Sequence, residues 1–361
     1  MTSGDKYKNL LILYRYIEHQ YQLSAYTDET LKSIQKTIDI AREQLFDEIS
    51  FRDMRMPKGR EDMVLEELNN LTLGIQTNLI KNIREAAVVA GEYSYREYDN
   101  ILSFDGKLSE TVGYNFTAIS PDQLRSMAVS TPVGGKLLSS WVKNTFDLRI
   151  IDEIQVAIMA DNFKGLGTQK IIRHMASAFD MIQTDAETLV RTYIADMNNT
   201  AAKAVYDANA DIIKYEVWNS TLEVAVSGRG TCLRCAGMDG RRFRLGDAHI
   251  RPPLHPRCRC FCVPETASYR DLGLDIDDLK RSIRPYTERA DKRKIIKAGQ
   301  IDGDFEAFFN SRGAQYQKDL LGPNRFRLLQ GGKISFSDLV DKHGDIRLLK
   351  KDRTGKFVGL R

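Results

Sequence analysis

Residues 231–265 read TCLRCAGMDGRRFRLGDAHIRPPLHPRCRCFCVPE and contain all five cysteines of this 361-residue chain. The first two form a Cys232-x2-Cys235 pair, and after 19 intervening residues a second pair reads His255-x2-Cys258. Two further cysteines follow at intervals of two residues. Paired donors at this spacing are typical of metal-binding knuckles, in which each pair directs two side chains at one ion. The stretch therefore predicts a metal site around which a small domain folds.

Zinc is the ion that this donor set favours, because thiolates and imidazole suit zinc whereas calcium and magnesium prefer oxygen. The candidate metal ligands are Cys232, Cys235, His255, Cys258 and Cys260. The preferred set of four leaves out Cys260, which could replace His255. On an extended strand Cys258, Cys260 and Cys262 would all point to one face. We expect a structural zinc, because the donors suffice to close a tetrahedron without an open position.

Disulfide bonds and unmetallated thiols are the two alternatives to a metal. An odd number of cysteines leaves one thiol over in any complete disulfide scheme, and a chain of this length does not need disulfides to fold. The opening residues, MTSGDKYKNLLILYRYIEHQ, carry charges within their apolar stretch, unlike a secretory signal. We therefore expect folding in a reducing cytoplasm. We expect His249 to be a surface histidine of a polar loop rather than a ligand.

The surrounding residues predict an α+β fold that is mostly helical, with a small antiparallel sheet stapled by the Cys/His zinc site. Residues 212–218 (IIKYEVW) are expected to form a strand, and residues 222–226 a possible second one. Asp239-Gly240 is the dipeptide typical of a type I′ hairpin turn. A helix from Thr184 to Ala208 is expected to precede the first strand, starting at a capping box formed by Thr184 and Glu187.

Residues 1–106 are predicted to form a helical N-terminal region. Apolar residues recur at intervals of three and four after Asp28, which we expect to be an N-cap, at Leu31, Ile34, Ile38, Ala41 and Leu45. A longer apolar stripe, from Val64 to Ala90, predicts a second helix. The expected break between them is the stretch MRMPKG at residues 54–59.

Three further regions follow the N-terminal one. Residues 107–265 are expected to form the domain that holds the zinc segment, with Ser120 as the N-cap of its first helix. Residues 266–300 are rich in charge and are predicted to be a linker. Residues 301–361 are predicted to be a C-terminal helical module with a basic tail. That module has little core of its own, so we expect it to dock on a neighbour.

The net charge of +4 is unevenly distributed along the chain. Residues 241–260 contain six arginines and one aspartate, and residues 346–361 contain six basic residues and one acidic residue. Such patches on a nearly neutral chain point to an anionic partner, of which DNA is one. The candidate DNA contacts are Arg241, Arg242, Arg244, Arg257 and Arg259. The alternative is that these arginines pair with carbonyls or carboxylates, and that the basic terminus is a solvated tail.

Several of these motifs resemble the Mu F-like minor head proteins of tailed bacteriophages, the phage head morphogenesis family. The first Cys-x2-Cys pair, Asp239-Gly240 and PPLHPRCRC at residues 252–260 match the family's CxxC, DG and PPLHPxCRC. The later stretches DFEAFF, LLGPNR and GKISFSDLV, at residues 304–309, 320–325 and 332–340, resemble the tail that often follows this domain. The resemblance covers roughly residues 120–340.

The resemblance implies a minor capsid protein that acts in head morphogenesis at or near the portal. Members are made in the host cytoplasm and enter the virion, at the head interior or portal vertex. The implied partners are the portal protein, head shell and scaffold proteins, and packaged double-stranded DNA, whose ejection the protein could aid. No membrane partner is expected during assembly.

The sequence does not predict an enzyme. None of its five histidines lies in an HExxH motif, and no GxSxG elbow occurs. In the zinc deaminases the histidine precedes the CxxC pair, whereas here it follows. The alternatives are a zinc-stabilised DNA-binding protein outside the virion and an ADP-ribosyltransferase-type toxin built on the same module.

Overall fold

A computed structural model of the protein describes most of the chain. The described residues are 8–51, 61–103, 168–225, 230–266, 283–289 and 295–361, with a few positions between 120 and 142. The expected break at residues 54–59 lies outside them. Contacts divide the chain into two units, one of residues 1–21, 94–119 and 199–361, and the other of residues 22–93 and 120–198. This division does not follow the four predicted regions, because it cuts through the long helices.

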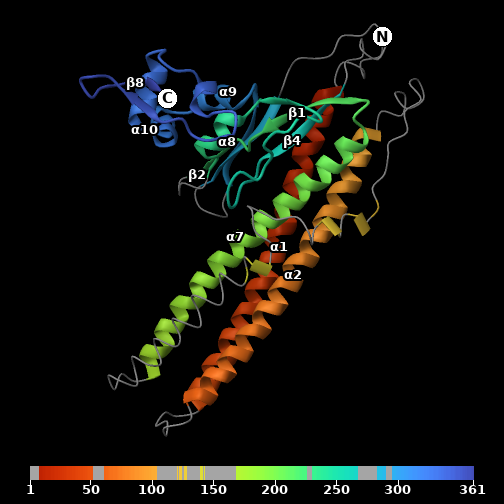
Figure 1. Cartoon of the computed structure of the whole chain (residues 1–361), viewed down its shortest axis with the longest axis vertical. Coiled ribbons are helices and arrows are strands. Elements are labelled where there is room, and N and C mark those ends of the chain that lie inside the picture. Colours follow the sequence, from red (N-terminus) through yellow and green to blue (C-terminus); the bar gives the residue numbers. More distant parts are fainter. Residues whose placement is uncertain are drawn as a thin grey trace. The chain divides into compact units, whose positions relative to one another are not determined.

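Three long helices are the largest elements of the described structure: α1 (Lys8–Phe51), α2 (Glu61–Ser103) and α7 (Thr168–Ala208) (Figure 1). In the unit of residues 22–93 and 120–198, they share one apolar core. Its buried members include Ile34, Ile38, Leu79, Ile83, Val190 and Tyr193. The predicted apolar stripes therefore form the interior of a helical bundle wherever their side chains are described.

Two expected helix starts are wrong, and one is confirmed. Helix α1 runs through Asp28 without a break, and the Asp28 carboxylate instead forms an ion pair with Arg191, whose guanidinium donates to it at 2.7 Å. Helix α7 begins at Thr168 and runs through Thr184. Capping sequences inside a helix are overridden when packing favours a continuous element. Ser120 does act as a cap, because its hydroxyl accepts the backbone N–H of Gln123 at 3.2 Å.

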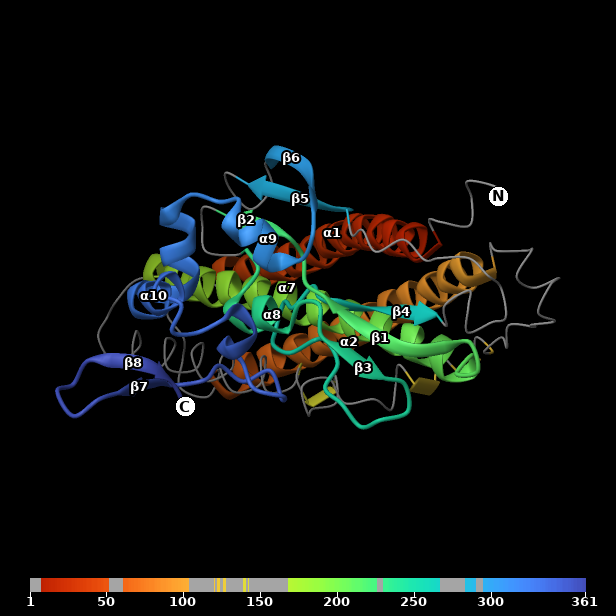
Figure 2. The same cartoon turned by 90° about the horizontal axis from the view of Figure 1, so that it is seen from above.

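A three-stranded antiparallel sheet lies in the other unit, in the order β3-β1-β4. Its strands are β1 (Ile213–Asn219), β3 (Arg242–Arg244) and β4 (Phe261–Thr266), seen together in Figure 2. The short helix α8 (Leu233–Met238) separates β1 from β3 along the chain. The strand expected at residues 212–218 and the small antiparallel sheet are thus confirmed. Buried residues of β1 and β4 pack with Tyr16, Tyr98 and Tyr206.

The turn after α8 differs from the predicted hairpin. Asp239 has φ −55° and ψ 136°, Gly240 has φ 74°, and the N–H of Arg241 bonds to the Met238 carbonyl at 3.1 Å. These angles fit a type II turn, in which only the second central residue needs a positive φ. A type I′ turn is favoured where it must match the twist of two flanking strands. This turn joins a helix to a strand, so that requirement does not apply.

A second sheet has the order β2-β5-β6 and mixes a parallel with an antiparallel pairing. It contains β2 (Glu223–Ala225), β5 (Ile283–Arg289) and β6 (Ile295–Asp302). The segment predicted as a charged linker therefore contributes two strands, although residues 267–282 lie outside the described part. Parallel pairing between β2 and β5 joins residues distant in sequence and leaves no local signal.

The C-terminal region comprises α9 (Phe305–Asn310), α10 (Ala314–Gln330), a 3-10 turn η3 (Phe336–Leu339) and a hairpin of β7 (Leu349–Lys351) and β8 (Phe357–Leu360). Its aromatic core includes Phe305, Phe308, Phe309 and Phe336, and it also takes in Ala236 of α8 and Leu222. The expected docking onto a neighbour is thus satisfied within the same unit. The predicted basic tail forms the β7–β8 hairpin. None of the described helices is long and apolar enough to cross a membrane.

Candidate metal centre

The first knuckle is the amino end of helix α8. Cys232 is its N-cap, with extended backbone angles, and its sulfur accepts the backbone N–H of Cys235 at 3.4 Å. Cys235 lies in the first turn and is buried. A single turn of helix therefore brings both sulfurs to one side of the knuckle.

The second knuckle is a tight turn that carries His255 and Cys258. The N–H of Cys258 bonds to the His255 carbonyl at 3.0 Å, which closes the turn. Arg257 within it has φ 63°, a conformation that residues other than glycine rarely adopt. The backbone thus accepts local strain where the two donors are brought together, as is common at functional sites.

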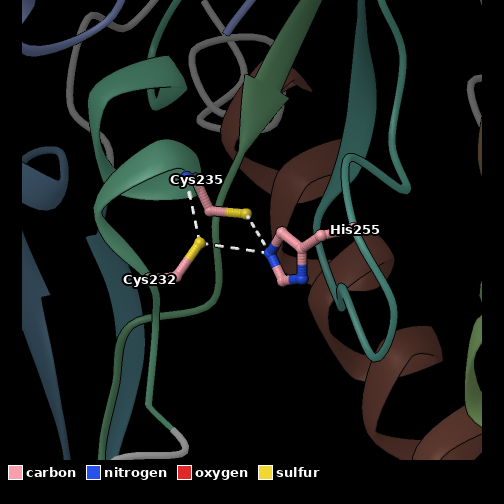
Figure 3. A group of neighbouring side chains, drawn as sticks. All are labelled: Cys232, Cys235 and His255. Carbon is pink, nitrogen blue, oxygen red and sulfur yellow. Dashed lines mark hydrogen bonds between the residues drawn. The ribbon is translucent and has the colours of Figure 1, made fainter. Parts of the chain in front are cut away.

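The donor atoms of the two knuckles converge, as Figure 3 shows for Cys232, Cys235 and His255. His255 Nε2 lies 3.1 Å from the Cys232 sulfur and 3.3 Å from the Cys235 sulfur. The sulfurs of Cys235 and Cys258 are 3.6 Å apart, and all five cysteines are free thiols rather than disulfides. Ligand bonds of about 2.0–2.3 Å in a tetrahedral zinc site imply edges of about 3.5–3.8 Å between donors. These three distances are within a few tenths of an ångström of such edges.

Two groups of three donors share Cys235. One joins it to Cys232 and His255, and the other joins it to Cys258 and Cys260. Within each group the donor atoms lie within 4.8 Å of one another, so each could hold a metal ion. All five predicted ligands are therefore brought together, and Cys235 occupies the common position.

Electrostatics within the cluster concentrate negative charge on one sulfur of each knuckle. Hydrogen bonding from Cys235 lowers the pKa of the Cys232 thiol to about 4, and likewise lowers the pKa of Cys258. The same contact with Cys232 raises the pKa of Cys235. The hydrogen bond to Cys232 raises the pKa of His255 to about 9. A bound cation would displace the remaining protons and take the sulfurs as thiolates.

The inner side of the cluster is apolar. Trp218 is fully buried there and packs with Cys235, Cys258, Cys260, Cys262, Met238 and Val340. Cys262 lies on β4 opposite Trp218 and belongs to neither donor group. Burial raises its pKa to about 11, so it behaves as a small core residue. An apolar shell of this kind restricts the access of water to a bound ion.

His249 is not the surface residue that the sequence predicted. Its side chain is only 10% exposed, and its Nε2 lies 2.8 Å from the carboxylate of Glu216. Its ring stacks on Phe243 at 4.6 Å between centroids. Glu216 is itself buried and also pairs with Arg251. His249 therefore belongs to a buried charge cluster on β1, and it is in neither donor group.

At least four of the five arginines proposed as DNA contacts interact within the chain, and the partners of Arg241, Arg242 and Arg259 are defined. Arg241 donates to the carbonyls of Asp341, Val340 and Ser337, at 2.6, 2.9 and 3.2 Å. Arg242 forms a two-pronged ion pair with Glu265, and Arg259 pairs with Glu223. Arg244 is exposed, and Arg257 is partly buried. Pairing with carbonyls and carboxylates, the alternative given by the sequence, thus applies to Arg241, Arg242 and Arg259.

The sequence assigned Asp239 only to a turn and did not predict that its carboxylate binds several segments of the chain. Its carboxylate accepts the Ser220 N–H at 2.7 Å, the Phe305 N–H at 2.8 Å and the Arg284 guanidinium at 2.6 Å. An aspartate directly after a buried helix could have hinted at this role, but its partners are all distant in sequence.

The structure thus defines a mostly helical α+β protein with a buried Cys/His cluster that could hold a metal ion. No protein-family model, no curated protein and no solved structure matches the chain.

Proposed function

We propose that the Cys/His cluster binds one zinc ion, through Cys232, Cys235, His255 and Cys258 or with Cys260 in place of His255. The donor spacing and the thiolate and imidazole chemistry support zinc over an oxygen-seeking cation. Four donors close the tetrahedron, so the ion would have a structural role. Metal analysis of purified, reduced protein tests this, with one zinc per chain as the expected result.

We propose further that the chain is a minor head protein of a tailed bacteriophage, acting in head assembly at or near the portal. The observation that carries this is the meeting of two motifs that the resemblance rests on. The knuckle stretch 252–260 and the later stretch 332–340 are separated in sequence, but both pack against helix α8. Val340 lies against Gly237, and Leu254 contacts Gly344 just beyond the later stretch.

This contact supports the view that the two stretches form one assembly module, and that their resemblances to the family are not independent of each other. Arg241 and Arg234 strengthen it, since both reach across to residues 337–345. No part of the proposed role requires catalysis, because the donors of the cluster can all be used to hold a metal. The proposed partners are the portal protein, the head shell and scaffold proteins, and packaged double-stranded DNA.

Quantitative mass spectrometry of gradient-purified particles tests the assignment. The chain should be present at a few copies per portal. Its absence from particles that contain portal protein would overturn a virion location.

A zinc-stabilised DNA-binding protein outside the virion is the second candidate, favoured by the basic β7–β8 hairpin. It would bind DNA without co-purifying with portal or particles. An ADP-ribosyltransferase-type toxin would instead consume NAD, which a hydrolysis assay detects.

A further inference from the structure

The β7–β8 hairpin packs against the rest of the protein and is not a solvated tail. Leu349, Phe357 and Leu360 on its inner side pack against the aromatic core of the C-terminal region. Leu349 pairs with Leu360 across the ladder, and the N–H of Arg361 bonds to the Leu348 carbonyl at 2.8 Å. Figure 2 shows the two strands side by side beside the C-terminus. One face of the hairpin is therefore packed against the protein, and the opposite face is open to solvent.

The hairpin, its turn and its two flanking residues carry a dense set of cations. Six basic residues lie between positions 346 and 361 and all are exposed: Arg347, Lys350, Lys351, Arg353, Lys356 and Arg361. In the described part of the chain, none of them forms an ion pair with a carboxylate. Opposite Lys350, Gly359 offers open space, since nothing lies within 4 Å of where its Cβ would be.

The single acid of this stretch is engaged within the turn. Asp352 accepts the N–H groups of Thr354 and Lys356 and the Thr354 hydroxyl, at 2.9, 3.0 and 2.7 Å. Its carboxylate holds the turn between the strands. Residues 346–361 therefore keep an excess of five positive charges, three of them within the hairpin itself.

The contrast with the arginines near the metal cluster decides where an anionic partner would dock. Arg241, Arg242 and Arg259 already bind carbonyls or carboxylates, and releasing them would break those contacts. The hairpin cations would not have to break an ion pair with a carboxylate, although Lys351 lies over the Phe357 ring at 4.9 Å. We propose that the β7–β8 hairpin is the element with which this protein contacts the phosphate backbone of double-stranded DNA. This deepens the DNA contact in the proposed function and relocates it away from the metal cluster.

Double-stranded DNA fits the hairpin better than other anionic partners do. Closely spaced cations match the regular phosphate spacing of a duplex, and the major groove admits a two-stranded β-ribbon. Binding of this kind is insensitive to base sequence and is strongly weakened by salt. Aromatic side chains typically anchor a protein at a membrane interface, and the large exposed apolar residues of this region, Ile346, Leu348 and Val358, include none.

The test measures how DNA affinity depends on salt for the full-length protein, using fluorescence anisotropy with a short random-sequence duplex. The hairpin variant replaces Lys350, Lys351, Arg353 and Lys356 with glutamine. A control variant with the same change in net charge replaces four exposed helical residues with glutamine: Lys32, Lys36, Lys81 and Arg96. Each phosphate contact contributes about 0.9 to the slope of log affinity against log salt, so the hairpin variant should lose about 3–4 units of slope. The control should lose far less.

An unchanged slope in the hairpin variant, with the wild-type metal content and circular dichroism, would overturn the proposal. So would tight binding to vesicles of anionic phospholipid in the absence of DNA binding. The particle measurement and the salt-slope measurement test the proposed function and the hairpin proposal separately. If the chain is absent from particles but the slope still falls, the hairpin contacts DNA outside a virion. If the chain is present but the slope is unchanged, only the hairpin proposal fails.

Discussion

Asp239 and Arg284 form a buried ion pair, with Oδ2 and Nη1 2.6 Å apart and side chains only 2% and 5% exposed. Asp239 ends the helix of the first metal knuckle, and Arg284 lies in β5. The same carboxylate accepts the first N–H of α9. One side chain thus ties the knuckle to the second sheet and to the C-terminal region.

We predict that Asp239→Asn lowers the free energy of unfolding by about 3–5 kcal/mol, because it leaves the Arg284 cation buried without its counter-charge. Chemical denaturation of the metal-loaded protein measures this loss. The control is Glu265→Gln, which breaks the exposed pair with Arg242 and should cost less than about 1 kcal/mol. Equal losses in the two variants would refute the role of Asp239.

The contact between Gly237 and Val340 gives a second prediction. A Cβ on Gly237 would lie 2.9 Å from one methyl carbon of Val340 and 3.0 Å from the other. Gly237→Ala should therefore destabilise the protein by about 1–3 kcal/mol, although alanine is favoured in an exposed helix.

Val340→Ala should remove the clash, so that Gly237→Ala becomes neutral or stabilising in that background. A double-mutant cycle measures the coupling between the two positions. Additive effects would mean that the stretch 332–340 does not pack on α8 as described.

Metal content separates the ligands from the structural cysteine. Cys235→Ser should abolish stoichiometric zinc, because Cys235 belongs to both donor groups. Cys258→Ser should lower the occupancy, whereas Cys262→Ser should keep it, because Cys262 is in neither group. Metal analysis of reduced protein gives the readout. Full occupancy in Cys258→Ser would exclude Cys258 as a ligand.

The Cys/His cluster was predictable from the sequence because its donors are close in the chain and their spacing reflects local turns. The long helices were predictable from apolar periodicity, but their ends were not. Asp28 and Thr184 have the chemistry of caps, and only the packing of the bundle shows that the helices continue through them. Long-range pairings leave no local pattern. The parallel pairing of β2 with β5, and the carbonyls bound by Arg241, therefore appear only in three dimensions.

The strained Arg257 allows a test of the second knuckle. A left-handed conformation costs an ordinary residue roughly 1–2 kcal/mol, and glycine avoids that cost while adding chain entropy to the unfolded state. Arg257→Gly should therefore keep the zinc and change stability by no more than about 1 kcal/mol. Arg257→Val should weaken zinc binding, because a β-branched residue fits this backbone poorly. Competition with a chromogenic chelator compares the two affinities.

Asp196 predicts how the helical bundle responds to pH. Burial raises the pKa of its carboxyl to about 7, and its Oδ2 has no hydrogen-bond partner among the described residues. Between about pH 4 and pH 7 the unfolded chain releases this proton while the folded chain keeps it, so stability falls as pH rises. Asp196→Asn should remove that fall and raise stability at pH 8 by no more than about 4 kcal/mol.

The control is Asp180→Asn, at an exposed position of the same helix, which should leave the dependence of stability on pH unchanged. Denaturation midpoints across this pH range decide the matter, and an equal slope in wild type and Asp196→Asn would rule out a protonated Asp196.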